Sequence, residues 1–255
     1  MRFLITSDWH IDAVTLGVPR RPEVLRYAKH LVGAVTHERI DAVIFAGDGF
    51  DPGDMLASLY LADLLSCFRA LMHASRLKRI YVIAGNHDVV EVDSALSTLK
   101  PLGMVEGIVL GEEPCVCRLE GFGERVAIML MPYISRAWAQ LRLAGVDPGP
   151  DALAGAAFGA ARAAKADGFK LVTVGHQTVP GAKLGSESAE MSRGRELDIP
   201  FRELSLLEPE LVINGHYHKP QTVQCGRVSV VIPGSPLSFT TDDPPTGKGY
   251  VVAEV

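Results

Sequence analysis

The sequence has no long apolar run, no paired cysteine motif and no excess of basic residues. A helix that crosses a membrane needs about 18 or more consecutive apolar residues, and no part of the 255-residue chain comes near that length. The opening residues, MRFLITSDWH, lack the basic segment and the longer apolar segment of a secretory signal. These absences argue against a membrane protein, and we expect a soluble, cytoplasmic protein.

The cysteines and the charge narrow the class of protein further. The four cysteines form no CxxC pair, so we expect reduced packing residues and not zinc ligands. The formal net charge is −5, which argues against a broad basic surface that binds nucleic acid. If the protein binds phosphate groups, it must therefore do so at a small, locally positive site. No internal repeat or linker interrupts the chain, so we expect one domain over residues 1–255.

Short apolar runs alternate with helical periods in the first half of the chain. Runs typical of strands occur at residues 3–6, 42–46 and 80–84. Between them we expect a helix with Pro22 near its first turn and a second helix that begins at Asp54. This βαβαβ order predicts a largely parallel sheet and an α/β fold.

The second half of the chain has shorter and more closely spaced apolar runs. Strands are expected at residues 107–110, 115–119, 126–131, 171–175, 211–215, 222–225, 228–232 and 250–255. An alanine-rich helix at 152–166, capped by Asp151, interrupts them. The last four strands are close enough in sequence to form hairpins, and we assign them to a second sheet. Residues 181–200 have no hydrophobic period, which is typical of a functional or mobile loop.

Polar side chains follow five of the expected strands, at the point where each strand ends. The segments are Ser7-Asp8-Trp9-His10, Gly47-Asp48, Gly85-Asn86-His87-Asp88, Gly175-His176 and Gly215-His216-Tyr217-His218. In an open α/β sheet this end of the strands is the edge where ligands bind. The glycine before four of the five segments lets the backbone turn sharply. We therefore expect these side chains to meet in one crevice.

The chemistry of these side chains predicts a metal site. Seven are metal-capable, and none is a thiolate: Asp8, His10, Asp48, Asn86, His176, His216 and His218. Carboxylate, amide and imidazole donors together suit Mn²⁺, Fe or Zn²⁺ better than an all-oxygen Mg²⁺ or Ca²⁺ site. Seven ligands are too many for one tetrahedral ion, but they fit two ions about 3.5–4 Å apart. One such motif is often only a turn, so the ordered set of five decides the interpretation.

These five motifs, taken as a set over nearly the whole chain, resemble the motifs of the calcineurin-like metallophosphoesterases. The resemblance implies a four-layer α/β/β/α sandwich with two mixed sheets. It also implies how the ligands divide: Asp8, His10 and His218 for one ion, Asn86, His176 and His216 for the other, and Asp48 as the bridge. Two divalent cations are the implied cofactor. We expect Mn²⁺, with Fe and Zn²⁺ as alternatives.

The same resemblance implies a hydrolase that cleaves phosphodiester bonds by a two-metal mechanism. His87 is not among the implied ligands, and an imidazole beside two cations can give a proton to the departing oxygen. We therefore interpret His87 as the general acid. Asp88, the next residue, is expected to accept the other ring N–H of His87 and so to fix its tautomer.

Segments beyond the metal motifs resemble one branch of that family, the SbcD-type DNA-repair exonucleases. They include AGDGFD, MPYIS, GHYHKPQ and PGSPLSF. This resemblance implies DNA as the substrate and an SMC-like ATPase as a partner. We also expect that the chain can form a homodimer. Residues 1–255 are expected to form the nuclease domain, without the capping and ATPase-docking domains of longer members. Asp51, in AGDGFD, is given no role.

For the candidate phosphate contacts and for Trp9, the sequence allows two interpretations each. Candidate contacts for nucleic-acid phosphates are Lys183, Arg193, Arg195 and Arg136. Three glutamates within residues 181–200 favour instead an ordinary solvated loop. Trp9 either stacks on a base or lies in the core.

Two rival functions also stay open at this point. The first is a phosphodiesterase of the same fold that acts on a small nucleotide, a cyclic nucleotide or a lipid-linked substrate. The second is a binding scaffold of the same fold without metal. The second is disfavoured, because all seven expected ligands and His87 are present.

Overall fold

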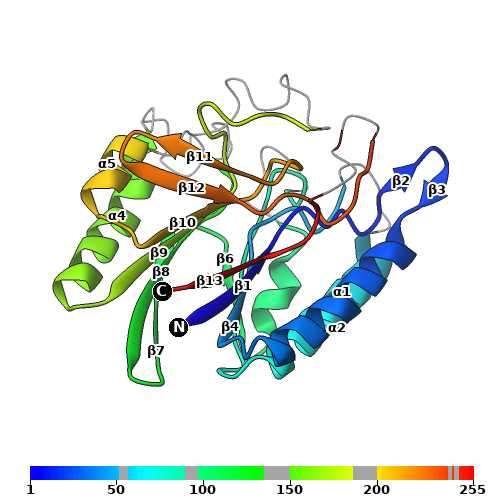
Figure 1. Cartoon of the computed structure of the whole chain (residues 1–255), viewed down its shortest axis with the longest axis horizontal. Helices are drawn as coiled ribbons and strands as arrows, with labels where there is room; N and C mark the ends of the chain where they lie inside the picture. Colours follow the sequence, from blue (N-terminus) through cyan, green and yellow to red (C-terminus); the bar gives the residue numbers. More distant parts are fainter. Residues whose placement is uncertain (52–56, 90–96, 135–149, 186–199, 241–242, 244–246) are drawn as a thin grey trace.

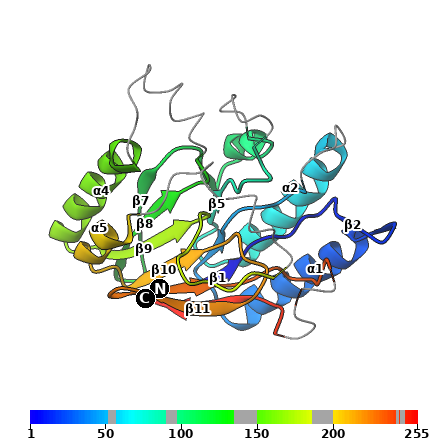
Figure 2. The same cartoon turned by 90° about the horizontal axis from the view of Figure 1, so that it is seen from above.

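Two β-sheets pack face to face between two layers of helices (Figure 1). The computed structural model describes residues 1–51, 57–89, 97–134, 150–185, 200–240, 243 and 247–255. Helices α1 (Arg21–His37) and α2 (Ala57–Ala74) cover one sheet, and α4 (Pro150–Ala166) and α5 (Phe201–Leu206) cover the other. Figure 2 shows the two helix pairs on opposite sides of the molecule. The predicted four-layer α/β/β/α arrangement is confirmed.

The first sheet has the strand order β13-β1-β4-β5-β6. Its strands are β1 (Arg2–Thr6), β4 (Ala42–Phe45), β5 (Ile80–Ile83), β6 (Ile108–Gly111) and β13 (Val251–Glu254). β1, β4, β5 and β6 are parallel. β4 and β5 are buried at every position, which explains why they read as unbroken apolar runs. Pro22 lies in the first turn of α1, as predicted.

The last strand joins the first sheet and not the second. The close spacing of the last four expected strands predicted that they share one sheet, but β13 pairs antiparallel with β1 in the register Ile5↔Val251. Val251 and Ala253 pack against the apolar core between the two sheets. Burial of these side chains therefore selects a partner strand that is distant in sequence.

The second sheet has the strand order β11-β12-β10-β9-β8-β7. Its strands are β7 (Cys115–Gly121), β8 (Glu124–Met131), β9 (Lys170–Gly175), β10 (Leu211–Asn214), β11 (Gln221–Cys225) and β12 (Val228–Ile232). β8, β9, β10 and β12 are parallel, while β7 and β11 are antiparallel edge strands. The expected hairpin over residues 222–232 is thus present, and the ends of β9 and β10 lie side by side.

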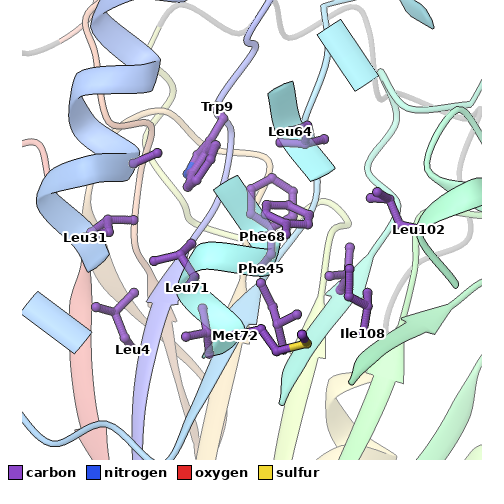
Figure 3. Packing of buried hydrophobic residues seen from close by; sticks show 14 of the residues in the cluster. Leu4, Trp9, Leu31, Phe45, Leu64, Phe68, Leu71, Met72, Leu102 and Ile108 are labelled. Carbon is purple, nitrogen blue, oxygen red and sulfur yellow. The ribbon is translucent and has the colours of Figure 1, made fainter. Parts of the chain in front are cut away.

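Trp9 lies in the core between the first sheet and its helices (Figure 3). Its side chain is fully buried, and its ring packs edge-on against Tyr27, Phe45 and Phe68 at centroid distances of 5.9, 5.5 and 5.7 Å. Its Nε1–H donates to Thr6 Oγ1 at 2.8 Å. Of the two interpretations of Trp9, the structure supports packing, because a buried ring has no face left for a base.

Four elements were not expected from the sequence. They are β2 (Val14–Thr15) and β3 (Val18–Pro19), which form a hairpin, the 3₁₀ helix η1 (Lys100–Met104), and α5. Asp54 lies outside the described residues, as does the side chain of Asp151. The four cysteines are free thiols and at least partly buried, which fits a packing role. Among the described helices, none combines the length and the apolar character needed to cross a membrane.

Candidate metal centre

Five strand ends meet at one edge of the molecule, and four of them line a cavity. The loops after β1, β4, β5 and β10 surround this cavity, and its volume is about 200 Å³. The loop after β9 supplies His176, which is fully buried next to Asp48 and does not line the cavity. The polar lining of the cavity includes His10, Asp48, Asn86, His87, His216 and His218. The remaining wall is formed by Asp51, by Ala13 with the first strand of the β2–β3 hairpin, and by Phe239 with Thr240. The structure thus places side chains from distant parts of the sequence around one opening.

The backbone at this edge adopts conformations that are rare for residues other than glycine. Positive φ angles occur at four of the seven predicted ligands: Asp8 (54°), His10 (42°), Asp48 (57°) and His216 (75°). A residue held in such a region costs about 1–3 kcal/mol, so the surrounding structure must keep it there. Strain of this kind is found preferentially at functional sites. The positions of these side chains are therefore imposed by the fold.

Two glycines let the strand ends approach one another closely. A Cβ atom on Gly85 would collide with the carboxylate of Asp48. A Cβ atom on Gly215 would collide with the carbonyl oxygen of Ala46. The glycines that precede the polar side chains in the sequence therefore serve close backbone approach at these two positions.

The first predicted ligand group consists of Asp8, His10 and His218. The Nε2 atoms of His10 and His218 face each other at 3.0 Å. The other ring nitrogen of His10, Nδ1, donates to the carbonyl oxygen of Phe50 at 2.9 Å, which leaves a lone pair on Nε2. One carboxylate oxygen of Asp8 accepts the backbone N–H of His216 at 3.0 Å. The other, Oδ2, is buried without a hydrogen-bond partner among the described residues.

The second predicted ligand group consists of Asn86, His176 and His216. The amide oxygen of Asn86 lies 3.2 Å from Nε2 of His176 and 3.0 Å from Nδ1 of His216. Nδ1 of His176 donates to the carbonyl oxygen of Ala46 at 2.6 Å, so its Nε2 is left to face Asn86 and Asp48. Three donor atoms from the loops after β5, β9 and β10 therefore meet at one point.

Asp48 lies between the two groups. Its Oδ2 atom is 3.1 Å from Nε2 of His176 and 3.9 Å from Nε2 of His10. Its other oxygen, Oδ1, accepts the backbone N–H of His87 at 3.0 Å. The side chain is almost fully buried. This is the placement that a bridging carboxylate requires.

A buried amide pair supports the second group. Gln177 accepts the backbone N–H of His176 at 2.9 Å and donates to the carbonyl oxygens of Met131 and Pro132 at 3.0 and 2.6 Å. Asn214 accepts the backbone N–H of Gln177 at 3.2 Å and donates to its carbonyl oxygen at 2.8 Å. These bonds tie the ends of β8, β9 and β10 together.

Burial controls the charge of the imidazoles. It lowers the pKa of both His10 and His216 to about 3, and neighbouring imidazoles add to the decrease. These two rings are therefore neutral near pH 7 and can offer a lone pair to a cation. Burial also opposes a charge on His176, but the adjacent Asp48 carboxylate raises the pKa of His176 to about 10. Without a cation Asp48 and His176 thus form an ion pair, and a bound cation would take the place of the proton on Nε2 of His176.

The donor atoms of both groups fit divalent cations. Asp8 Oδ2 is a buried carboxylate oxygen without a partner among the described residues, and the ring nitrogens of His10 and His218 point at each other. A buried carboxylate oxygen left without a partner costs free energy, and a cation next to Asp8 Oδ2 would satisfy it. The set combines nitrogen and oxygen donors without a thiolate, as Mn²⁺, Fe and Zn²⁺ prefer.

Asp88 does not orient His87, which corrects the expected pairing. Its two carboxylate oxygens accept backbone N–H groups from Asp48 (2.8 Å), Gly49 (2.9 Å), Phe50 (3.2 Å) and Gly85 (2.8 Å). Four donors saturate a carboxylate, so no acceptor is left for the imidazole. Asp88 instead joins the loop after β4 to the loop after β5.

Asp51, and not Asp88, is the carboxylate that faces His87, although His87 Nδ1 is buried without a hydrogen-bond partner among the described residues. Oδ1 of Asp51 lies 3.5 Å from Nδ1 of His87, and the backbone N–H of Asp51 donates to Asp12 Oδ1 at 2.6 Å. Burial opposes a charge on His87, but Asp48 and Asp51 together raise the pKa of this imidazole. A signal for Asp51 was present in the sequence, because it follows Asp48 by three residues at the same strand end.

Of the four candidate phosphate contacts, the structure describes Lys183 alone. Lys183 is exposed, its backbone forms two hydrogen bonds with the Gln221 side chain, and it does not line the cavity. Arg136, Arg193 and Arg195 lie outside the described residues. The structure therefore brings the seven predicted ligands and His87 together, but not Lys183.

Two curated proteins of similar sequence are both named as the D subunit of the nuclease SbcCD. The protein of Bacillus subtilis (strain 168) is 27% identical over 269 residues, which cover 100% of this chain and 66% of that protein. The protein of the same name from Rhodobacter capsulatus is 29% identical over 266 residues, which cover 93% of this chain and 63% of that protein. The chain thus spans just under two thirds of the length of these relatives.

Two solved structures share the fold at low sequence identity. A dimetal phosphatase from Danio rerio has a TM-score of 0.54 at 10% identity, over 99% of this chain and 91% of that chain. GAP50, the anchor in the inner membrane complex of Plasmodium, has a TM-score of 0.52 at 14% identity, over 99% and 80%. Residues 1–220 match the calcineurin-like phosphoesterase family. Because this match spans most of the chain, the protein belongs to that family and is a metallophosphoesterase.

Proposed function

We propose that this protein is a metal-dependent phosphodiesterase that cleaves DNA and serves in DNA repair. The observation that carries the proposal is the cavity at which the metal-capable side chains and His87 meet. DNA is favoured over other phosphodiesters because the relatives that match 93–100% of the chain are named as parts of a nuclease.

In this proposal each ligand group would hold one divalent cation, and Asp48, which lies near donors of both groups, would serve both. The first is held by Asp8, His10 and His218, and the second by Asn86, His176 and His216. Two such cations, when bound, supply neutralisation of the phosphate charge and activation of water. We expect Mn²⁺, because the donor set mixes imidazole nitrogen with carboxylate and amide oxygen.

His87 is the proton donor for the departing oxygen in this proposal. It lines the cavity and directs Nδ1 toward Asp51 at 3.5 Å, so the other ring nitrogen is left for the substrate. The negative charge of Asp51 favours the protonated form of His87, which is the form that can donate a proton. We therefore assign Asp51 as an electrostatic support of His87. A general acid of this kind contributes about 10²–10⁴-fold to the rate.

The test is a cleavage panel with defined metals. Purified protein is stripped with EDTA, reloaded with Mn²⁺, Fe²⁺, Zn²⁺ or Mg²⁺, and incubated with linear duplex DNA, circular single-stranded DNA or bis(p-nitrophenyl) phosphate. We expect degradation of linear DNA with Mn²⁺ and none in EDTA. The His87→Gln variant, purified in the same way, controls for contaminating nucleases.

Two outcomes would contradict different parts of the proposal. Cleavage of the small diester alone, with intact DNA in every metal, would exclude DNA as the substrate and leave a phosphodiesterase. A protein that binds the metals but cleaves none of the three substrates would contradict the catalytic proposal itself.

The names of the relatives also suggest a protein partner for this chain. Their name describes one subunit of a complex, and we extend this to a complex of the present chain with an SMC-like ATPase. Co-purification of the two chains from a common host tests it, with the separate chains as controls. A homodimer is a further prediction, and sedimentation as a species of 27.4 kDa would contradict it.

A further inference from the structure

One wall of the cavity is not made by the end of a strand. Phe239, in the segment between β12 and β13, packs on the rings of His10 and His218 with centroid distances of 5.3 and 5.6 Å. Its carbonyl oxygen accepts a hydrogen bond from Thr15 Oγ1 of the β2–β3 hairpin at 2.9 Å. This segment therefore closes the side of the site on which the first ligand group lies.

Asp243 supports this wall from behind. Its side chain has no exposed area, and its Oδ2 accepts the backbone N–H of Phe239 at 2.8 Å and of Thr240 at 3.4 Å. Its other oxygen, Oδ1, lies 3.7 Å from Nδ1 of His218. A carboxylate that faces the outer ring nitrogen of a metal-binding histidine orients the ring and raises its basicity.

Lys248 completes the arrangement. Its ammonium group donates to the carbonyl oxygen of His218 at 2.9 Å and to Ser235 Oγ at 2.7 Å. It also lies 3.6 Å from Oδ1 of Asp243, and its side chain is only 10% exposed. A buried charge is tolerated when an opposite charge and hydrogen bonds compensate it, as they do here. His218 is thus contacted at both its ring and its backbone carbonyl.

We infer that Asp243 and Lys248 are positioning residues that orient His218 toward the first cation. This inference rests on the proposed metal-binding role of His218. With Nδ1 turned to Asp243, the Nε2 lone pair of His218 faces Nε2 of His10, 3.0 Å away. Lys248 keeps the backbone after β10 in place. Neither residue lines the cavity or belongs to the five sequence motifs, so their effect on catalysis passes through His218.

The decisive variant is Asp243→Asn. It removes the negative charge that faces His218 but keeps an oxygen that can accept the N–H groups of Phe239 and Thr240. Mn²⁺ binding to metal-free protein is measured by isothermal titration calorimetry, and thermal unfolding is measured in EDTA. We expect the affinity for one of two Mn²⁺ ions to fall about 10–100-fold, with the other affinity and the unfolding temperature unchanged.

Three further variants separate orientation of His218 from general stability. Asp167→Asn is the matched control, because Asp167 is 51% exposed and pairs with Arg118, and it should leave both affinities unchanged. Asp243→Glu restores the charge and should recover part of the lost affinity. Lys248→Met keeps the aliphatic stem without the ammonium group, and it should weaken the same ion as Asp243→Asn.

Unchanged affinities for both ions in Asp243→Asn would overturn the inference. An equal loss for both ions with a lower unfolding temperature would also overturn it, because that result indicates a general structural role. If the wild-type protein itself bound no Mn²⁺, the proposed function would fail as well. The two failures are therefore distinguishable in one series of titrations.

Discussion

The two predicted cation positions use similar side chains but rest on different parts of the fold. The core position is formed by Asn86, His176 and His216, and the loop position by Asp8, His10 and His218. The core position follows β5, β9 and β10, and the Gln177–Asn214 amide pair ties the ends of β9 and β10 together. The loop position depends on Asp243 and Lys248, which come from a segment later in the chain.

Burial separates only one histidine of each position: the side chain of His176 is fully buried, whereas that of His218 is 12% exposed. The other ligands do not follow this contrast, because Asp8 and His10 are almost fully buried and Asn86 is partly exposed. The difference between the positions therefore lies in the segments that support them. Because a preformed site loses less free energy on ordering its ligands, we expect the core position to hold its ion more tightly than the loop position.

The largest effect is expected from Asp48→Ala, which tests whether the two positions are linked. Asp48 Oδ2 lies near donors of both positions, so its removal should release both ions and abolish cleavage. Metal content after loading and desalting is measured by mass spectrometry. Retention of one ion at full occupancy would show that Asp48 serves a single position.

The comparison itself is tested by removing one histidine from each position. His176→Ala and His218→Ala should each reduce the bound Mn²⁺ from two ions to one. In EDTA, His176→Ala should also lower the free energy of unfolding by about 2 kcal/mol, because it leaves a cavity and an unpaired Ala46 carbonyl. His218→Ala should cost less than about 1 kcal/mol. The free energies of unfolding are measured in urea. If the two substitutions lowered them equally, the two positions would not differ in rigidity.

Replacing His87 sharpens the comparison by leaving both positions intact. His87→Gln should bind two Mn²⁺ ions with wild-type affinity while turnover falls about 10²–10⁴-fold, because a proton donor is lost. Single-turnover cleavage and metal titration are measured on the same sample. His73→Gln, an exposed histidine of α2, is the control. Loss of an ion in His87→Gln would place His87 among the ligands.

The smallest effect on cleavage is expected from Gln177→Leu, which loosens the support of the core position. The substitution leaves buried backbone groups of His176, Met131 and Pro132 without their partner, and each unsatisfied group lowers the free energy of unfolding by about 1–3 kcal/mol. Only the ion of the core position should bind more weakly. An equal effect on both ions would mean that the amide pair supports the whole edge.

The strand ends and their ligands could be predicted because each carries a local signal. An apolar run, a sharp turn and a polar side chain within a few residues of it mark the end of a buried strand, as in the run before Asp48. The layered arrangement follows from the alternation of strands and helices, since such units pack in few ways.

The rest depends on contacts between distant segments. Asp88 adjoins His87 in the chain, yet it turns inward to four backbone N–H groups, and Asp51 faces the imidazole instead. That outcome is decided by the path of the backbone, which short motifs do not specify. Asp243 lies beyond every motif, and it reaches His218 only because the segment after β12 folds back.

The pairing of β1 with β13 has a consequence for synthesis of the protein. β1 begins at Arg2 and its partner β13 ends at Glu254, so the first sheet is finished only when nearly the whole of this polypeptide segment has left the ribosome. Until then one side of β1 presents unsatisfied backbone groups, to which another nascent chain can add. This edge of the first sheet is therefore the last part of the two sheets that can be completed, because β13 is the last strand to be synthesised.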